Sequence, residues 1–250
     1  MLLELNNVMY SNGNFRLGPL NTLIPEGKIT SIMGQNGSGK TTTLKILHGD
    51  LKSSSGHAIL DGIDVFKYKP LDLARKTSFI AQETYNPLNL TVRDVMEVSG
   101  YARDFDESAM IDALDIFHLG KFLYRDFNMI SGGEKKLVTI AASIYQGSDI
   151  IIMDEPTNFL DVDNQVLVYN VMNEFCRKGK TIITATHDIS AVSAISDYVI
   201  MLKNGGIVDQ GNTSKTLTVD NLKKVFNVPF MVYNTGHGII FSTQFNIKKQ

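Results

Sequence analysis

Apolar residues in this chain fall either into short continuous runs or into helical spacing. A continuous apolar or β-branched run predicts a strand that is buried on both faces, as in a parallel sheet. Apolar residues three or four apart predict an amphipathic helix instead. The predicted buried strands are residues 28–33, 77–81, 149–153 and 181–186, and helices are predicted at 42–47 and 162–177. This order of strands and helices indicates an α/β core.

Three further regions accompany the core in the sequence. Short strands separated by turn residues precede residue 28 and predict an antiparallel β-subdomain. Helical periodicity over residues 83–146 predicts an inserted helical subdomain. Residues 215–250 contain one short predicted helix and one predicted strand, and form a small C-terminal appendage. The α/β core with its β-subdomain is therefore assigned to residues 1–82 and 147–214.

Composition and charge exclude several classes of protein. The chain has 24 Lys and Arg against 26 Asp and Glu, so we expect neither a broad nucleic-acid-binding face nor a polybasic membrane anchor. The single cysteine, Cys176, excludes an intramolecular disulfide and is expected to be a core-side residue. No apolar run approaches the ~20 residues needed to cross a bilayer, and the N-terminus lacks the basic region of a signal peptide. We expect a cytosolic chain whose membrane role can only be peripheral.

Residues 34–41 match the phosphate-binding loop pattern G-x-x-x-x-G-K-[ST] at every fixed position, between a predicted strand and a predicted helix. Glycines let the backbone turn its N–H groups toward an anion, and the helix adds the positive end of its dipole. Lys40 can reach the β- and γ-phosphates of ATP, and the Thr41 hydroxyl can bind Mg²⁺. The predicted ATP-binding residues here are Asn36, Gly37, Ser38, Gly39, Lys40, Thr41 and Thr42.

Polar residues end three of the predicted strands. Gln82 follows one strand, Asp154 and Glu155 follow another, and His187 follows a third. Ligands of open α/β sheets bind at the carboxyl ends of the strands. Two carboxylates at the end of a buried strand are costly unless they bind a cation or transfer a proton. We therefore expect Asp154 in the Mg²⁺ site and Glu155 beside the attacking water. Taken alone, each of these residues could also be a surface or structural residue.

Two further segments, at Ser131 and at Tyr10, are candidate parts of the nucleotide site only when the rest of the chain is considered. Ser131 and Glu134 are spaced as a capping box that opens a helix. The run from Ser131 through Gly132 and Gly133, taken alone, is equally well explained as that helix start. Tyr10 could stack on a nucleotide base, although an ordinary β-hairpin also accounts for a tyrosine there.

The order and spacing of these segments resemble those of an ABC-type ATPase. The phosphate loop, Gln82, Ser131 to Glu134, Asp154-Glu155, Leu160-Asp161 and His187 are similar to that family's Walker A, Q-loop, signature, Walker B, D-loop and H-switch. The similarity covers residues 1 to about 210. Residues 60–62 and 73–76, with the appendage, look most like the ATPases that power import of iron chelates (siderophores, haem) or vitamin B12.

The resemblance implies a P-loop NTPase fold: an ABC-ATPase core with an antiparallel β-subdomain and an inserted helical subdomain. It also implies a head-to-tail homodimer that holds two ATP molecules at its interface. Each site would join Lys40 and Thr41 of one subunit to Ser131 and Gly133 of the other. ATP and Mg²⁺ are the implied ligands.

The family's residue roles transfer to matching positions. Lys40, Gln82, Glu155 and His187 are the implied catalytic residues, with Glu155 polarising the attacking water. The implied metal-site residues are Thr41, Gln82 and Asp154. The implied nucleotide-site residues outside the phosphate loop are Tyr10, which would stack on adenine, Ser131, Gly132, Gly133, Glu134 and Asp161.

The resemblance further implies partners and a place in the cell. A coupling helix of an integral membrane permease would enter a groove beside Gln82 and the helical subdomain. An extracytoplasmic substrate-binding protein would act with the permease, and no nucleic acid is expected. The chain would lie peripherally on the cytoplasmic face of the cell membrane.

The sequence departs from the family pattern in details of the site-to-site contacts. The signature begins with Ile130 and has Glu134 where glutamine is commoner. The helix that follows lacks the usual arginines, since it continues with residues 135–143 as KKLVTIAAS. Asn158 and Phe159 stand where small residues are typical. The phosphate-binding residues themselves are complete.

Two other functions stay open from the sequence. A soluble ABC ATPase of repair, translation or cluster assembly typically has coiled-coil insertions, paired cassettes or basic faces, and this sequence has none of these. A nucleotide-gated binding module without turnover would not need Glu155 and His187. The transported substrate is not encoded in a motor subunit.

Overall fold

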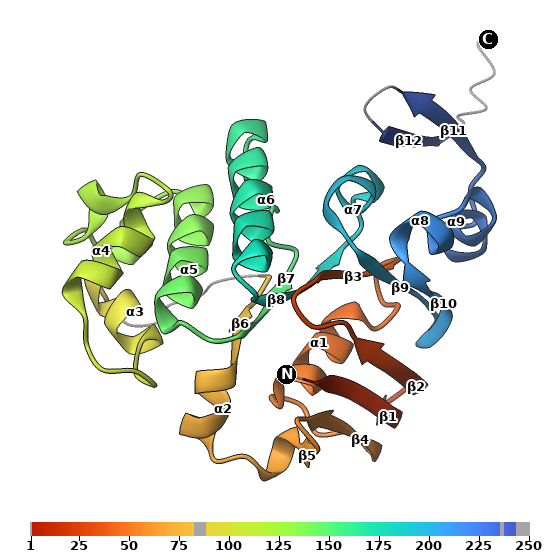
Figure 1. The fold of residues 1–250 in the computed structure, drawn as a ribbon, viewed down its shortest axis with the longest axis horizontal. Coiled ribbons are helices and arrows are strands. Elements are labelled where there is room, and N and C mark those ends of the chain that lie inside the picture. The colour runs from red at the N-terminus through yellow and green to blue at the C-terminus, as the bar shows by residue number, and fades with distance from the viewer. Residues whose placement is uncertain (1, 83–88, 236–237, 244–250) are drawn as a thin grey trace.

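A mostly parallel sheet runs through the middle of the molecule (Figure 1). The computed structural model describes residues 2–82, 89–235 and 238–243, and within them the strand order of this sheet is β10-β9-β3-β8-β7-β6. Strands β9 to β6 pair in parallel, and β10 pairs antiparallel with β9 at one edge. The bounds are β3 (Ile29–Gly34), β6 (Thr77–Ile80), β7 (Ile150–Asp154), β8 (Thr181–Thr186), β9 (Tyr198–Lys203) and β10 (Gly206–Asn212). The predicted α/β core is confirmed.

A smaller antiparallel sheet of order β2-β1-β4-β5 lies beside the main sheet, as the turns near the N-terminus predict. One hydrophobic cluster joins both sheets to the helix that follows the phosphate loop, where Leu44 and Leu47 are fully buried. The bounds are β1 (Leu3–Asn12), β2 (Phe15–Ile24), β4 (Ser55–Leu60), β5 (Ile63–Asp64) and α1 (Lys40–His48). A short 3₁₀ helix η1 (Val65–Lys67) and α2 (Pro70–Lys76) lead from this sheet into β6.

The opposite face of the main sheet carries a second hydrophobic cluster. Along β7, Ile150 and Ile152 belong to the first cluster, while Ile151 and Met153 belong to the second. This alternation follows from the two-residue period of a strand, and it explains why the run is apolar throughout. The second cluster also contains the inner side of α6 (Val162–Arg177).

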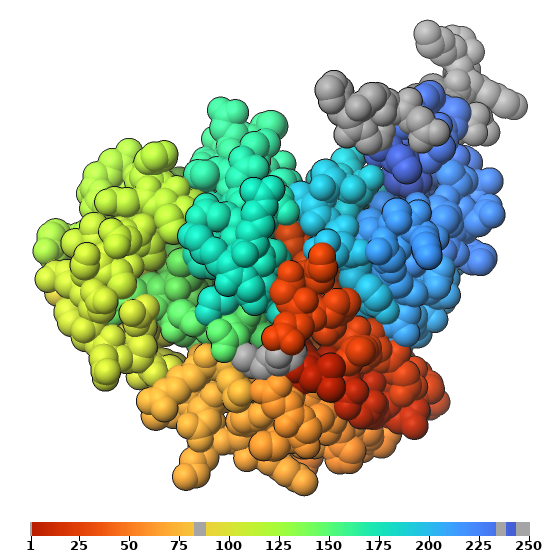
Figure 2. All heavy atoms as spheres, viewed as in Figure 1, coloured from red at the N-terminus to blue at the C-terminus, as the bar shows by residue number. Residues whose placement is uncertain are grey.

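Residues 89–146 form a helical lobe, seen on the left in Figure 1 and in yellow-green in Figure 2. Capping boxes start two of its helices, with Thr91 and Asp94 at α3 and with Ser131 and Glu134 at α5. Phe127 is fully buried in the lobe's core. The bounds are α3 (Val92–Ser99), α4 (Glu107–Asp115), η2 (Gly120–Phe122), η3 (Phe127–Met129) and α5 (Gly132–Gln146).

The C-terminal part has more structure than the sequence patterns predict. Helices α7 and α8 and strand β11 are not predicted by the sequence patterns. Helix α7 is short and buries only Ala191 and Val192 among its own residues. A third hydrophobic cluster joins α7 and β11 to β9. The bounds are α7 (Ile189–Ile195), α8 (Thr213–Thr216), α9 (Val219–Phe226), β11 (Phe230–Thr235) and β12 (Gly238–Thr243). In the described ranges, no helix has the length and apolarity that crossing a membrane requires.

Gly205 fastens the β9–β10 turn to the phosphate loop and to β2. Its N–H donates to the Ser38 carbonyl at 3.1 Å, its carbonyl accepts from the Gly18 N–H at 2.7 Å, and its φ is +80°. An added Cβ would lie 1.9 Å from the Arg16 carbonyl oxygen. We expect Gly205→Ala to lower the free energy of unfolding by at least about 2 kcal/mol in urea titrations.

The matched control is Gly62→Ala. Gly62 also has a positive φ, +79°, but nothing lies within 4 Å of an added Cβ. This variant should lose only the left-handed backbone preference, about 1 kcal/mol. Equal losses in the two variants would contradict the steric explanation at Gly205.

Candidate nucleotide site

The phosphate loop connects β3 to α1 and packs directly on the antiparallel sheet. Gly39 has φ +106°, and a Cβ at this position would lie 2.4 Å from the Leu17 side chain of β2. Only glycine allows this approach and this backbone conformation together. The loop therefore lies between β2 on one side and the ends of the parallel strands on the other, as a strand–loop–helix phosphate site requires.

A cavity of about 410 Å³ opens on this loop. The lining residues from the loop and α1 are Asn36, Gly37, Gly39, Lys40, Thr41 and Thr42, and those from other segments are Phe15, Gln82 and Glu155. The volume falls in the range of small-molecule sites. Residues far apart in the sequence thus meet in one cavity, and most of the predicted phosphate-binding residues line it.

Lys40 is held in place by the loop that it completes. Its Nζ donates to the carbonyls of Gly34 at 2.9 Å and Gln35 at 3.2 Å, and the side chain is almost fully buried. Burial lowers the pKa of Lys40, while the charges of Glu155 and Asp154 work in the opposite direction. Lys40 lines the cavity with its ammonium bound to backbone carbonyls, and a phosphate in the cavity would be a stronger acceptor than a carbonyl.

Thr41 and Asp154 form the part of the site that fits Mg²⁺. The Thr41 hydroxyl donates to Asp154 Oδ2 at 2.6 Å, whereas the buried Oδ1 of Asp154 has no hydrogen-bond partner. Burial raises the pKa of Asp154, against the hydrogen bond from Thr41. The described residues contain no cluster of three or more His, Cys, Asp and Glu. One carboxylate and one hydroxyl suit Mg²⁺, which takes its other ligands from phosphates and water.

Glu155 lies immediately after β7 in a strained, left-handed backbone conformation, with φ +47°. Its N–H donates to the Ala185 carbonyl of β8 at 3.0 Å. Its carboxylate accepts a hydrogen bond from the Asn158 side chain and lies 3.3 Å from His187 Nδ1. A non-glycine residue held in such a conformation is typical of functional sites. The structure therefore brings Glu155 and His187 together, although His187 itself is not among the residues that line the phosphate cavity. It also adds Asn158, whose contact the sequence did not indicate.

The signature residues line a different cavity of about 620 Å³. Its lining residues are Ser131, Gly132, Gly133, Glu134, Leu137, Phe159, Leu160, Asp161 and Asn164. None of them lines the phosphate cavity. The capping box is formed as predicted, since Ser131 N–H donates to Glu134 Oε2 at 2.8 Å. Within one described chain, Ser131 and Lys40 therefore belong to separate sites.

Among the described residues, the aromatic side chain that lines the phosphate cavity is that of Phe15, and Tyr10 is absent from the lining. Tyr10 pairs with Leu17, and Asn12 pairs with Phe15, so Tyr10 and Phe15 are diagonal neighbours on one face of the β1–β2 hairpin. Tyr10 is half-buried against the first hydrophobic cluster. Phe15, nearer the hairpin turn, reaches the loop. The register of the hairpin determines which of the two rings lines the cavity, and spacing along the sequence alone cannot show this.

Two ring-removing substitutions test which residue contacts adenine. If Phe15 stacks on the base, Phe15→Leu raises the Kd for ATP about three- to tenfold, because leucine fills the space without an aromatic face. Tyr10→Leu then changes the Kd less than about twofold. Equilibrium binding of a fluorescent ATP analogue gives both values. The opposite ranking would support Tyr10 as the residue that contacts adenine.

The C-terminal appendage also contacts the phosphate loop. The Gln35 side chain donates to the Phe226 carbonyl at the end of α9, at 3.1 Å. Lys203, at the end of β9, donates to Asn227 Oδ1 at 2.7 Å. These contacts could not be predicted from the sequence, because Gln35 is a variable position of the loop pattern.

Comparisons with known proteins agree with this geometry. Residues 17–158 match the family model described as ABC transporter. The iron(3+)-hydroxamate import ATP-binding protein FhuC of Bacillus subtilis is 32% identical over 218 residues, which cover 84% of this chain and 81% of that protein. The petrobactin import ATP-binding protein FpuC of Bacillus anthracis is 29% identical over 99% of this chain and 95% of its own.

Solved structures give the same family. An inward-facing structure assigned to the metal-chelate type of ABC transporter superposes with a TM-score of 0.82 at 25% identity and covers 98% of both chains. A dimeric ATP-binding cassette in a post-hydrolysis state, bound to ADP and Pi, has a TM-score of 0.75 at 26% identity and covers 84% of this chain and 98% of its own. The chain therefore belongs to the ABC transporter family and is one of its ATP-hydrolysing ATP-binding cassettes.

Proposed function

We propose that this chain is the motor subunit of an importer for an iron chelate, such as a siderophore or haem. The observation that carries the substrate class is the similarity, over most of both chains, to FhuC and FpuC, which are import ATP-binding proteins for iron(3+)-hydroxamate and petrobactin. The motor would work on the cytoplasmic face of the membrane with permease subunits and, through them, with an extracytoplasmic binding protein.

A head-to-tail homodimer would complete two ATP sites. Each chain has one phosphate cavity and one signature cavity with no lining residue in common. The second subunit would bring Ser131 and Gly133, at the start of α5, to the γ-phosphate, where a helix N-terminus favours an anion. Asp161 and Phe159 line the same signature cavity, so they would lie at the interface between the two sites.

In the mechanism, the backbone N–H groups of the phosphate loop and Lys40 would bind the β- and γ-phosphates of ATP. Mg²⁺, held by Thr41 and Asp154, would neutralise charge on these phosphates. Glu155 would polarise a water whose oxygen attacks the γ-phosphorus while the bond to the β–γ bridging oxygen breaks, which gives ADP and phosphate. Asn158 orients the Glu155 carboxylate, and His187 would steady the γ-phosphate.

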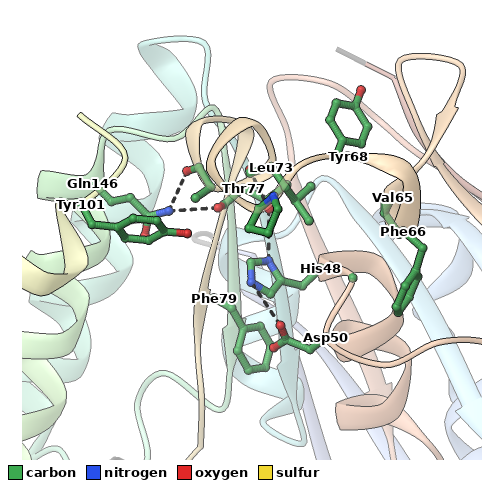
Figure 3. A pocket seen from close by; sticks show the side chains of 13 residues that line it. His48, Asp50, Val65, Phe66, Tyr68, Leu73, Thr77, Phe79, Tyr101 and Gln146 are labelled. Atoms are coloured by element: carbon green, nitrogen blue, oxygen red, sulfur yellow. Dashed lines mark hydrogen bonds and ion pairs between the residues drawn. The ribbon is translucent and has the colours of Figure 1, made fainter. Parts of the chain in front are cut away.

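The groove in Figure 3 is the proposed docking site for a short helix of the permease. It has a volume of about 560 Å³ and lies between the segment from α1 to β6 and the helical lobe. The exposed apolar side chains of Phe66 and Tyr101 line it. The Gln146 side chain donates to the carbonyls of Ala74 at 2.7 Å and Thr77 at 3.1 Å. Because β6 leads directly to Gln82, a helix in this groove could pass its movement to the ATP site.

A charge placed in the groove tests the docking proposal. Tyr101, 59% exposed, lines the groove, whereas Tyr124, 74% exposed, belongs to the same lobe and is not in its lining. Tyr101→Glu should reduce co-purification of the permease at least about tenfold, since a carboxylate cannot be buried against an apolar helix without a partner. ATP binding by the isolated subunit should not change. Tyr124→Glu should retain the permease, and retention in both variants would argue for a different docking surface.

Uptake by cells of the source organism tests the substrate class. Cells whose only copy of the gene encodes Glu155→Gln should lose uptake of one class of ⁵⁵Fe-labelled chelate among hydroxamate, catecholate and haem. Unchanged uptake of all ferric chelates would exclude the iron proposal. Loss of labelled vitamin B12 uptake alone would move the assignment to that substrate.

A further inference from the structure

Lys136 is a buried cation beside the nucleotide site that no step of the mechanism uses. It lies in the first turns of α5 and is only 3% exposed. Its Nζ donates to the carbonyls of Ala81 at 2.8 Å, Gln82 at 3.3 Å and Asp154 at 3.3 Å. The ammonium therefore joins the chain after β6 to the end of β7.

Burying an ammonium is costly unless its protons are all hydrogen-bonded. Lys136 has three protons and three carbonyl acceptors, so its donor capacity is filled. In the described part of the chain, none of the ion pairs involves Lys136. Burial lowers its pKa to about 8, while the charges of Asp154 and Glu155 oppose that shift. A buried methionine or leucine would fill the same space at lower cost, so packing alone does not explain a lysine.

The three carbonyls belong to the two segments that carry the catalytic side chains. Gln82 lines the phosphate cavity, and Asp154 contacts Thr41 within that site. Lys136 itself lies five residues after Ser131, in the helix that Ser131 caps. One side chain thus connects the signature helix of a chain to the phosphate site of the same chain.

We propose that Lys136 is a positioning residue that holds Gln82 and Asp154 at a fixed separation and couples this separation to the position of the signature helix. The inference rests on the proposed hydrolytic roles of Gln82, Asp154 and Glu155. A nucleotide bound to the partner subunit would contact Ser131, and a rigid helix would carry the resulting shift to Lys136. The ends of β6 and β7 would then reach the separation that hydrolysis requires only when the partner's nucleotide contacts the start of α5.

The prediction is a loss of turnover without a loss of ATP binding. Lys136→Met keeps the length and apolar volume of the side chain but removes all three hydrogen bonds. Since misplacing a catalytic group by about 1 Å can cost up to about 100-fold in rate, we expect kcat to fall about 10- to 100-fold. KM and the Kd for ATP should stay within about threefold, because Lys136 does not line the phosphate cavity.

The control on the same helix is Lys135→Met. Lys135 lies over the Phe127 ring, 6.0 Å from its centroid, whereas the three carbonyls accept from Lys136. Its kcat should stay within about twofold of the wild-type value. Thermal melts establish that each variant is folded at the assay temperature. If Lys136→Met does not fold, Lys136→Gln replaces it, because glutamine keeps a shorter hydrogen-bond donor. The same result is expected: a lower kcat with KM nearly unchanged.

A double-mutant cycle with Gln82→Ala separates positioning from a merely structural role. Because Lys136 would act on both Gln82 and Asp154, part of its effect should pass through Gln82, and the double variant should lose less in kcat than the product of the two single losses. Fully multiplicative losses, or a wild-type kcat in the folded Lys136 variant, would overturn the proposal. A wild-type protein without ATPase activity would instead refute the proposed function, so the two failures can be told apart.

Discussion

Glu155→Gln is expected to bind ATP as tightly as the wild-type protein and to lose about 100- to 1,000-fold in kcat. The amide has the shape of the carboxylate but cannot polarise or deprotonate a water. In the proposed mechanism, phosphate binding depends on Lys40 and the loop backbone, which this change leaves in place. The left-handed backbone at Glu155, with φ +47°, suits glutamine no worse than glutamate, so the variant should fold.

Steady-state ATPase kinetics and equilibrium ATP binding measure this prediction. Glu174→Gln is the matched control, because Glu174 lies on the exposed side of α6 in an ion pair with Lys178. That variant should retain wild-type turnover, since exposed ion pairs contribute little. Wild-type turnover in Glu155→Gln would remove Glu155 from its assigned role.

Ser131→Arg is expected to abolish turnover, by at least about 100-fold, while leaving ATP binding to the isolated subunit within about threefold. The reason is geometric: Ser131 lines the signature cavity and is absent from the phosphate cavity. An arginine side chain would fill the space that the partner's γ-phosphate needs. Loss of the helix cap should cost only about 1 kcal/mol of stability.

Ser108→Arg provides the control for adding an arginine to the helical lobe. Ser108 is exposed in α4, outside the signature cavity. It should keep both binding and turnover. If Ser131→Arg loses monomer ATP binding together with turnover, the shared-site model of the homodimer fails.

Local patterns were enough to predict much of the nucleotide site. The phosphate loop depends on glycine spacing between a strand and a helix, and both elements form as the pattern requires. Asp154 and Glu155 come at the end of an apolar strand, β7. Both faces of this strand are apolar because each packs against one of the two hydrophobic clusters. Parallel neighbours place Glu155 beside β8, so its meeting with His187 could be predicted from strand ends alone.

Other parts of the site depend on tertiary contacts that leave no local signal. Phe15, near the hairpin turn, lines the cavity and Tyr10 does not, although both are partly buried against the same hydrophobic cluster. The sequence marked Lys136 only as a departure from the usual arginine-rich helix, without its three carbonyl contacts. Helix α7 is too short for a periodic pattern, and Asp188 alone signals its start.

The most direct test of the central claim, a transport motor driven by ATP, is purification of the tagged chain from detergent-solubilised native membranes. The proteins that accompany it are identified, and ATPase activity is measured with and without them. We predict recovery of a polytopic membrane protein whose presence changes the turnover rate. Recovery of soluble protein or nucleic acid alone, with turnover unaffected by membranes, would contradict the claim and favour a soluble ABC ATPase.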